Sequence, residues 1–81
     1  MSLYYFNISD GRTHLDEHGT ELPSLAEARH EAIRSSGEIL RDGGGPAMWA
    51  GEPWRMWVTD EPSGGGKTLL TLKFSASEGD S

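Results

Sequence analysis

The sequence predicts an α+β fold of two layers in the order β-β-α-β-β, with two hairpins in one sheet and a single helix on one face. Three observations lead to this prediction. An Asp-Gly turn joins two segments near the N-terminus, a helix start signal precedes a stretch of helical periodicity, and two alternating segments follow near the C-terminus. Strand order stays open, because two hairpins can join edge to edge in more than one way.

The first hairpin is predicted around Asp10-Gly11, after the aromatic and β-branched residues 3–8. Asp-Gly is a favoured two-residue turn because both positions tolerate positive φ. Such a turn places Ile8 opposite Thr13 and thereby sets the register. The predicted apolar face carries Tyr4, Phe6, Ile8, Thr13 and Leu15, and the predicted polar face carries Tyr5, Asn7, His14 and Asp16.

The helix is predicted from about Leu25 to about Arg41. Ser24 and Glu27 form an S-x-x-E capping box, in which each residue's side chain bonds the backbone of the other. The glycine run 43–45 is the predicted stop. The apolar stripe that should face the sheet consists of Leu25, Ala28, Ala32, Ile33, Ser36, Ile39 and Leu40.

The chain is predicted to form one domain over residues 1–75, followed by a disordered tail at 76–81. Residues 42–53 lack periodicity and are predicted to form a flexible loop that carries Met48 and Trp49. The passage from Asp16 to Leu22 is rich in turn formers and is predicted to be irregular.

The second hairpin is predicted from the alternating segments 54–60 and 68–74, joined by the glycine-rich residues 61–67. Gly66-Lys67-Thr68 resembles the end of a P-loop, but the first glycine of that motif would fall at Glu61. A strand is predicted after the glycines where a P-loop needs a helix. The glycines are therefore interpreted as turn residues.

Charge and composition argue against several classes of function. The formal net charge is −6 and the seven Lys and Arg are scattered, so we expect no nucleic-acid partner. The chain has no cysteine, which excludes disulfides and thiolate metal sites. No signal peptide or membrane span is recognisable, so a cytoplasmic protein without a membrane partner is expected.

No catalytic set is recognisable, and the sequence predicts a protein that is not an enzyme and needs no cofactor or metal. His14, Asp16 and His18 resemble part of a metal site, but no further ligand with supporting contacts is evident, so solvated polar residues near a turn are favoured. Arg29 lies within the apolar stripe. Either its alkyl stem packs on the sheet, which is slightly favoured, or it pairs with a hairpin carboxylate.

Aromatic and apolar side chains on the sheet face away from the helix form the candidate interaction surface. Tyr5, Trp57 and Leu69 are assigned to this face, together with Trp49 from the loop. Such aromatics also occur on RNA-binding platforms, but those carry flanking Lys and Arg. Trp49 is either a flap over the edge of the core or an anchor for a partner.

The segments YYFNISDG, DEHGTELPSLAEARHEA and VTDE, followed by L-x-L-x-F, resemble a family of small, largely alphaproteobacterial proteins known as a domain of unknown function. The resemblance covers most of the chain outside the Gly43–Pro53 loop and the tail, and it implies no activity, cofactor or catalytic residue. The residues that carry it are Gly11, Gly19, Leu22, Leu25, Ala28, Arg29 and Ala32. More weakly, the first half resembles HicB-type antitoxins, which bind a partner protein and dimerise. Because no appended DNA-binding segment is recognisable, the resemblance implies only the binding of a small partner protein.

The function expected from these observations is a non-enzymatic protein-interaction or regulatory domain that binds an unknown protein or a second copy of itself. The alternative is a HicB-like antitoxin component that binds a small partner protein. Neither the partner, the pathway nor the oligomeric state follows from the sequence.

Overall fold

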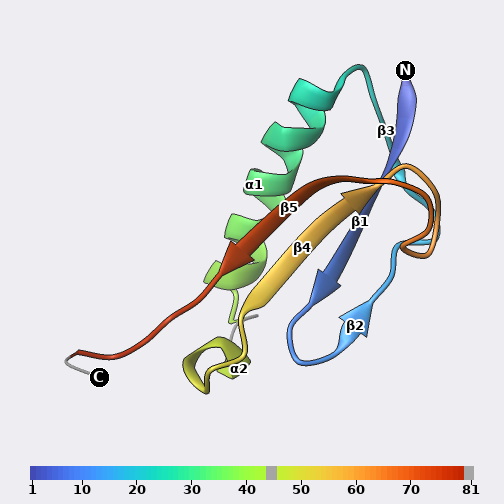
Figure 1. Ribbon diagram of the computed structural model, residues 1–81. Helices are drawn as coiled ribbons and strands as arrows, with labels where there is room; N and C mark the ends of the chain where they lie inside the picture. The colour runs from blue at the N-terminus through green and yellow to red at the C-terminus, as the bar shows by residue number, and fades with distance from the viewer. Residues whose placement is uncertain (44–45, 80–81) are drawn as a thin grey trace.

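The computed structural model describes residues 1–43 and 46–79, and it shows an antiparallel sheet with one main helix on one side (Figure 1). The predicted α+β class and the β-β-α-β-β order are confirmed, with a short extra strand and a single-turn helix added. The elements are β1 (Ser2–Ser9), β2 (Thr13–His14), β3 (Thr20–Leu22), α1 (Leu25–Arg41), α2 (Pro46–Trp49), β4 (Trp54–Thr59) and β5 (Thr68–Phe74).

The strand order is β2-β1-β4-β5, so β1 and β4 form the centre of the sheet and every pairing is antiparallel. The short strand β3 also pairs with β1, on Ser2, Leu3 and Tyr4. β2 pairs with the other end of β1, and β5 pairs only with β4 among the described strands. Figure 1 shows β5 and β2 at opposite sides of the sheet.

The predicted two-residue turn at Asp10-Gly11 is wrong by one residue. Ile8 pairs with His14 rather than with Thr13, and Ser9 pairs with Thr13. The loop therefore contains three residues, closed by hydrogen bonds from the Asp10 backbone N–H to the Arg12 carbonyl (3.0 Å) and from the Arg12 N–H to Asp10 Oδ1 (3.2 Å). Because side chains alternate along a strand, the shift moves His14 onto the face of β1 that carries Ile8.

α1 begins and ends where the sequence predicts. Ser24 Oγ accepts a hydrogen bond from the Glu27 backbone N–H at 3.3 Å, which satisfies one of the free donors of the first turn. At the other end the Asp42 N–H donates to the Glu38 carbonyl, and Gly43 follows with φ +90°. Gly44 and Gly45 of the predicted stop lie outside the described residues.

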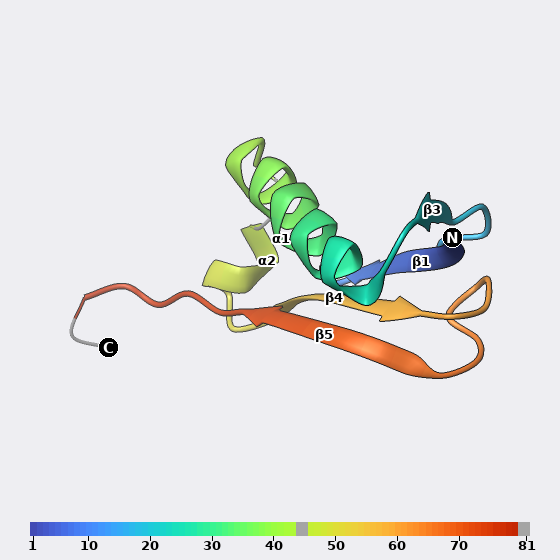
Figure 2. The same ribbon diagram turned by 90° about the horizontal axis from the view of Figure 1, so that it is seen from above.

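The core lies between α1 and the sheet face formed by alternate residues of the strands. Figure 2 shows α1 and α2 on the same side of the sheet. Trp54 and Phe74 meet edge to face at 5.7 Å between ring centroids, and Met48 of α2 packs against the same cluster. The buried core residues are Tyr4, Ala28, Ala32, Trp54, Met56 and Val58.

Two parts of the predicted helix stripe do not reach the core. Leu25 is 43% exposed and Ile33 is 66% exposed. Both lie on α1, whose buried residues are the small Ala28, Ala32 and Ser36. The apolar stripe is wider than the strip of helix that the sheet covers, so an apolar flank remains in contact with water.

The predicted flexible loop at 42–53 contains the helical turn α2, and residues 44–45 within it lie outside the described part of the chain. No regular element is assigned to residues 76–79 of the predicted tail, and residues 80–81 are outside the described part. Among the described helices, none combines the length and apolar character needed to cross a membrane.

Candidate functional site

The four residues of the predicted interaction surface do not form one patch. Tyr5 is only 8% exposed, so it offers little surface to a partner. Trp57 is half-buried, Leu69 is half-buried and packs against the core, and Trp49 on α2 is 59% exposed. A register shift beside Thr59 leaves Leu69 without a paired residue on β4, and this bulge breaks the alternation from which its outward direction was predicted.

Tyr5 is buried because the segment after β2 folds over the sheet face away from α1. A Cβ atom at Gly19 would lie 2.8 Å from Tyr5 Cε1, so the chain passes directly against the tyrosine ring. Gly19 has φ +75°, a conformation that glycine adopts without strain. The part of this face that was predicted to be open is therefore covered by the protein itself.

A buried polar network holds this covering segment in place. Asn7 is fully buried, and its Nδ2 donates to the carbonyls of Tyr5 (3.3 Å) and Trp57 (3.1 Å) and to Thr59 Oγ1 (3.2 Å). Its Oδ1 accepts from the Asp16 backbone N–H at 3.0 Å. The side chain thus links β1, β4 and the segment after β2, which is a structural role that its predicted place on the polar face did not indicate.

Asp16 completes the network through its carboxylate. Oδ2 accepts from the Phe6 N–H, and Oδ1 accepts from the N–H groups of His18 and Gly19, all at 3.0 Å. Burial acts to raise the pKa of Asp16, but the hydrogen bonds from Gly19, Phe6 and His18 outweigh it, and the net pKa is lowered. The carboxylate fills the gap between β2 and β3 along the edge of β1.

His14, Asp16 and His18, the candidate metal ligands of the sequence analysis, each form other contacts in the structure. The Asp16 carboxylate is occupied by backbone donors, and His14 Nε2 lies 3.3 Å from Asp10 Oδ1 instead. His18 contributes its backbone N–H to Asp16. Within residues 1–43 and 46–79, no group of three or more His, Asp or Glu side chains is arranged to hold a metal ion.

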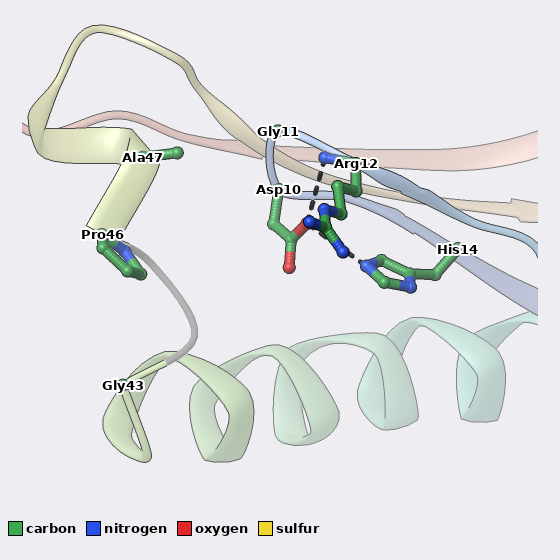
Figure 3. A pocket seen from close by; sticks show the side chains of 7 residues that line it. All are labelled: Asp10, Gly11, Arg12, His14, Gly43, Pro46 and Ala47. Atoms are coloured by element: carbon green, nitrogen blue, oxygen red, sulfur yellow. Dashed lines mark hydrogen bonds and ion pairs between the residues drawn. The ribbon is translucent and has the colours of Figure 1, made fainter.

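A broad groove of about 550 Å³ lies between the first hairpin and the C-terminal end of α1. Figure 3 shows the side chains of Asp10, Arg12 and His14 gathered on the hairpin side, facing α1. The remaining described lining is Gly11, Gly43, Pro46 and Ala47. These residues include no hydroxyl or thiol nucleophile, so the arrangement can contact a polar group but lacks the parts of a nucleophilic site.

A second groove of about 220 Å³ lies between α1 and the outer strand of the sheet, and we call it the β5 groove. Ile33 on its helix side is 66% exposed, whereas Leu70 and Leu72 on its strand side are half-buried. The residues that line it are Arg29, Ile33, Leu70, Thr71 and Leu72. Its lining is mostly apolar, and it runs beside a strand whose outer edge has no partner strand within the described chain.

The structure favours the first of the two arrangements for Arg29, in which its alkyl stem packs on the sheet. Arg29 is exposed on the β5 groove, consistent with an alkyl stem lying along apolar surface. It forms no ion pair with Asp10, Asp16 or another carboxylate of the described residues. The apolar stripe of α1 and the alternation of residues 68–74 were visible in the sequence. The exposure of Ile33, and its position across one groove from Leu70 and Leu72, depend on how the helix lies on the sheet.

Arg55 and Lys73 lie directly opposite each other on β4 and β5, on the sheet face away from α1. The Arg55 guanidinium stacks on the Trp57 ring with 4.4 Å from Cζ to the ring centroid. Neither cation forms an ion pair with a carboxylate of the described residues. Like charges that face each other across two strands repel, so this pair is a local source of positive potential on an acidic protein.

The glycine-rich connection between β4 and β5 has none of the geometry of a phosphate loop. The Asp60 N–H donates to the Lys67 carbonyl, and the Lys67 N–H donates to Asp60 Oδ1 at 2.7 Å. A Cβ at Gly66 would overlap the Asp60 carboxylate. Strand β5 follows at once, which confirms the prediction that no helix follows these glycines.

Comparison with known proteins gives one match. The family model described as a domain of unknown function (DUF6894) matches residues 3–75. This confirms the resemblance to a domain of unknown function. No curated protein and no solved structure matches the chain.

Proposed function

We propose that this chain, which belongs to the DUF6894 family, is a non-catalytic protein-interaction domain that binds an extended segment of another protein along β5. The observation that carries the proposal is an edge strand of seven residues, Thr68–Phe74, with an apolar groove beside it. The opposite side of the sheet ends in the short strands β2 and β3, which cover the edge of β1 together with the Asp16 carboxylate.

The backbone of β5 supplies the affinity in this proposal. An edge strand presents alternate N–H and C=O groups with no partner, and an added strand satisfies them. The added strand directs every second side chain to the α1 side of the sheet, where the β5 groove can receive it. Ile33, which is 66% exposed, then gains a covering partner.

The absence of catalysis is part of the proposal and is supported by the form of the two grooves. The β5 groove is lined by Leu, Ile and Thr beside one Arg, and the groove beside the first hairpin contains one His, one Asp and one Arg. Neither described lining combines a nucleophile, a base and a set of anion-stabilising donors. Binding is the activity that these surfaces support.

Selection from a random peptide display library tests the proposal. We expect binders whose affinity falls at least tenfold on the Ile33→Glu protein, because a carboxylate in the groove excludes apolar side chains. Ala50→Glu is the matched control, since Ala50 is exposed and lies outside the groove lining. Binding to this control should equal binding to the wild type.

The same experiment separates the forms that the interaction could take. Failure to recover binders, or recovery of binders that tolerate Ile33→Glu, would contradict an interaction at the β5 edge. Self-association would show in light scattering as a dimer that Ile33→Glu dissociates. A HicB-like role requires a small toxin whose activity the wild type suppresses and the Ile33→Glu variant does not.

A further inference from the structure

We propose that the segment bound along β5 is antiparallel and acidic, with the pattern acidic–apolar–any–apolar. This inference rests on the proposed function and names the chemistry of its partner. The carboxylate lies opposite Lys73, and the two apolar side chains lie opposite Leu72 and Leu70. Three separate features of the β5 edge lead to this pattern: its uncompensated cations, its apolar groove and the antiparallel sheet.

Only some of the Lys and Arg side chains of the chain form ion pairs with carboxylates. Arg34 pairs with Glu31 and Glu38, and Arg41 approaches Asp42. Five cations pair with no carboxylate of residues 1–43 and 46–79, and all of them except Arg12 lie on or beside β5; the five are Arg12, Arg29, Arg55, Lys67 and Lys73. On a chain of net charge −6, cations left without carboxylates beside one strand favour an acidic ligand at that strand.

Lys73 is the cation that an added strand would meet directly. On β4 it faces Arg55, so its neighbour on one side has the same charge. Its other side is the open edge, where a residue of an added strand would lie opposite it on the same sheet face. A carboxylate at that position balances both cations, whereas a lysine or arginine would place three like charges in a row.

The apolar positions follow from the groove. Leu72 and Leu70 pair with Met56 and Val58 on β4 and lie on the core side of the sheet. Residues of the added strand opposite these leucines would point into the β5 groove, between the leucines and Ile33. An antiparallel strand passes Lys73 first, then Leu72, Thr71 and Leu70, which yields the stated order of residues.

A second copy of the chain does not supply this pattern. β5 contains no carboxylate, so a symmetric β5–β5 pair cannot neutralise Lys73. A pair centred on Thr71 places Leu69 opposite Lys73, and a pair centred on Leu70 places Lys67 there. Lys73 therefore acts against self-pairing while it favours an acidic segment.

Synthetic peptides titrated into ¹⁵N-labelled protein at low salt test the inference. The probe is TTEVTVTT, and the controls are TTQVTVTT, which removes the charge, and TTEVVTTT, which places the valines on opposite faces. We expect shifts in the amides of β5, with binding about fivefold weaker for the glutamine peptide. The TTEVVTTT peptide should bind more weakly still, because only one valine can enter the groove.

The decisive experiment reverses the charges of Lys73 and of the peptide residue opposite it. Lys73→Glu should weaken the binding of TTEVTVTT and strengthen the binding of TTKVTVTT. Arg41→Glu, an equal charge change at the end of α1, should change neither affinity. Equal binding of the glutamate and glutamine peptides overturns the inference while edge-dependent library binders still support the proposed function. A dimer that Ile33→Glu dissociates, together with no peptide binding, assigns the edge to a second copy and also overturns it.

Discussion

The two edges of the sheet are built in opposite ways. Along β1 the chain returns twice to form β2 and β3, and Asp16 bonds the Phe6 N–H in the gap between them. Along β5 no described segment returns, and the neighbouring cations have no carboxylate partners. The comparison shows that the chain ends the sheet on one side with two short strands and buried polar side chains, and on the other side with one continuous strand of seven residues; we call these the closed edge and the open edge.

The largest effect is expected from Asn7→Leu at the closed edge. The leucine removes three donated hydrogen bonds and leaves the Asp16 N–H without its acceptor in a buried site. We expect the free energy of unfolding to fall by about 3 kcal/mol, since each unsatisfied buried group costs roughly 1–3 kcal/mol. Urea denaturation followed by tryptophan fluorescence measures the change.

Thr71→Val is the matched substitution at the open edge. Thr71 is exposed and, unlike Asn7, its side chain forms no hydrogen bond with the described residues, so the free energy of unfolding should change by less than about 0.5 kcal/mol. If Thr71→Val cost as much as Asn7→Leu, the two edges would contribute equally and the contrast would fail.

A smaller effect with a defined pH dependence is expected from Asp16→Asn. An amide has one oxygen for the three N–H donors and turns an NH₂ group toward one of them, so we expect a loss of about 2 kcal/mol at pH 7. The pKa of Asp16 is lowered in the folded protein. Its stabilisation is therefore present above the unfolded-state pKa of about 3.9 and is lost as pH falls through the lower folded pKa.

Denaturation of wild type and Asp16→Asn from pH 7 to pH 2 checks this sign. The difference in stability between the two proteins should shrink as the carboxyl is protonated. Glu31 also has a lowered pKa, owing first to its hydrogen bond from Arg34, and the difference between the two proteins removes that shared contribution. A difference that stays constant over this range would show that the Asp16 charge does not close the edge.

An effect between those of Asp16→Asn and Thr71→Val is expected from Gly19→Ala. The new Cβ would lie 2.8 Å from the Tyr5 ring at φ +75°, and the combined strain should cost about 1.5 kcal/mol. Gly43→Ala is the control, because Gly43 also has positive φ but a Cβ there meets no atom within 4 Å. Calorimetric melting of both variants separates the backbone cost from the contact with Tyr5.

The elements that depend on neighbouring residues were predictable. The helix limits followed from Ser24, Glu27 and the glycines after Arg41, and both strands of the second hairpin followed from alternation. The length of the turn at Asp10-Gly11 was predicted wrongly by one residue. Arg12 belongs to a three-residue loop, and a sequence with Asp-Gly fits that loop nearly as well as a two-residue turn. That single residue decides which face His14 occupies.

The sites depended on contacts between distant segments and were not predictable in the same way. Alternation along β1 correctly places Tyr5 on the sheet face away from α1, but a turn that ends at Gly19 covers its side chain. Asp16 resembles a metal ligand in the sequence, but in the fold its carboxylate accepts a hydrogen bond from the Phe6 N–H in the gap between β2 and β3. The β5 groove needs Ile33 and Leu72, which are far apart in the chain, to lie beside each other.

By itself, the sequence determined the main helix and the strands of the two hairpins, because capping, alternation and turn chemistry act over a few neighbouring residues. Strand β3, in a passage predicted to be irregular, and helix α2, in a segment predicted to be a flexible loop, did not follow from these local signals. Only the tertiary structure decided which edge of the sheet is closed and which cations lack partners. Those outcomes depend on how β1 and β4 join the two hairpins, and the free energy of that pairing comes from contacts between residues that no local pattern connects.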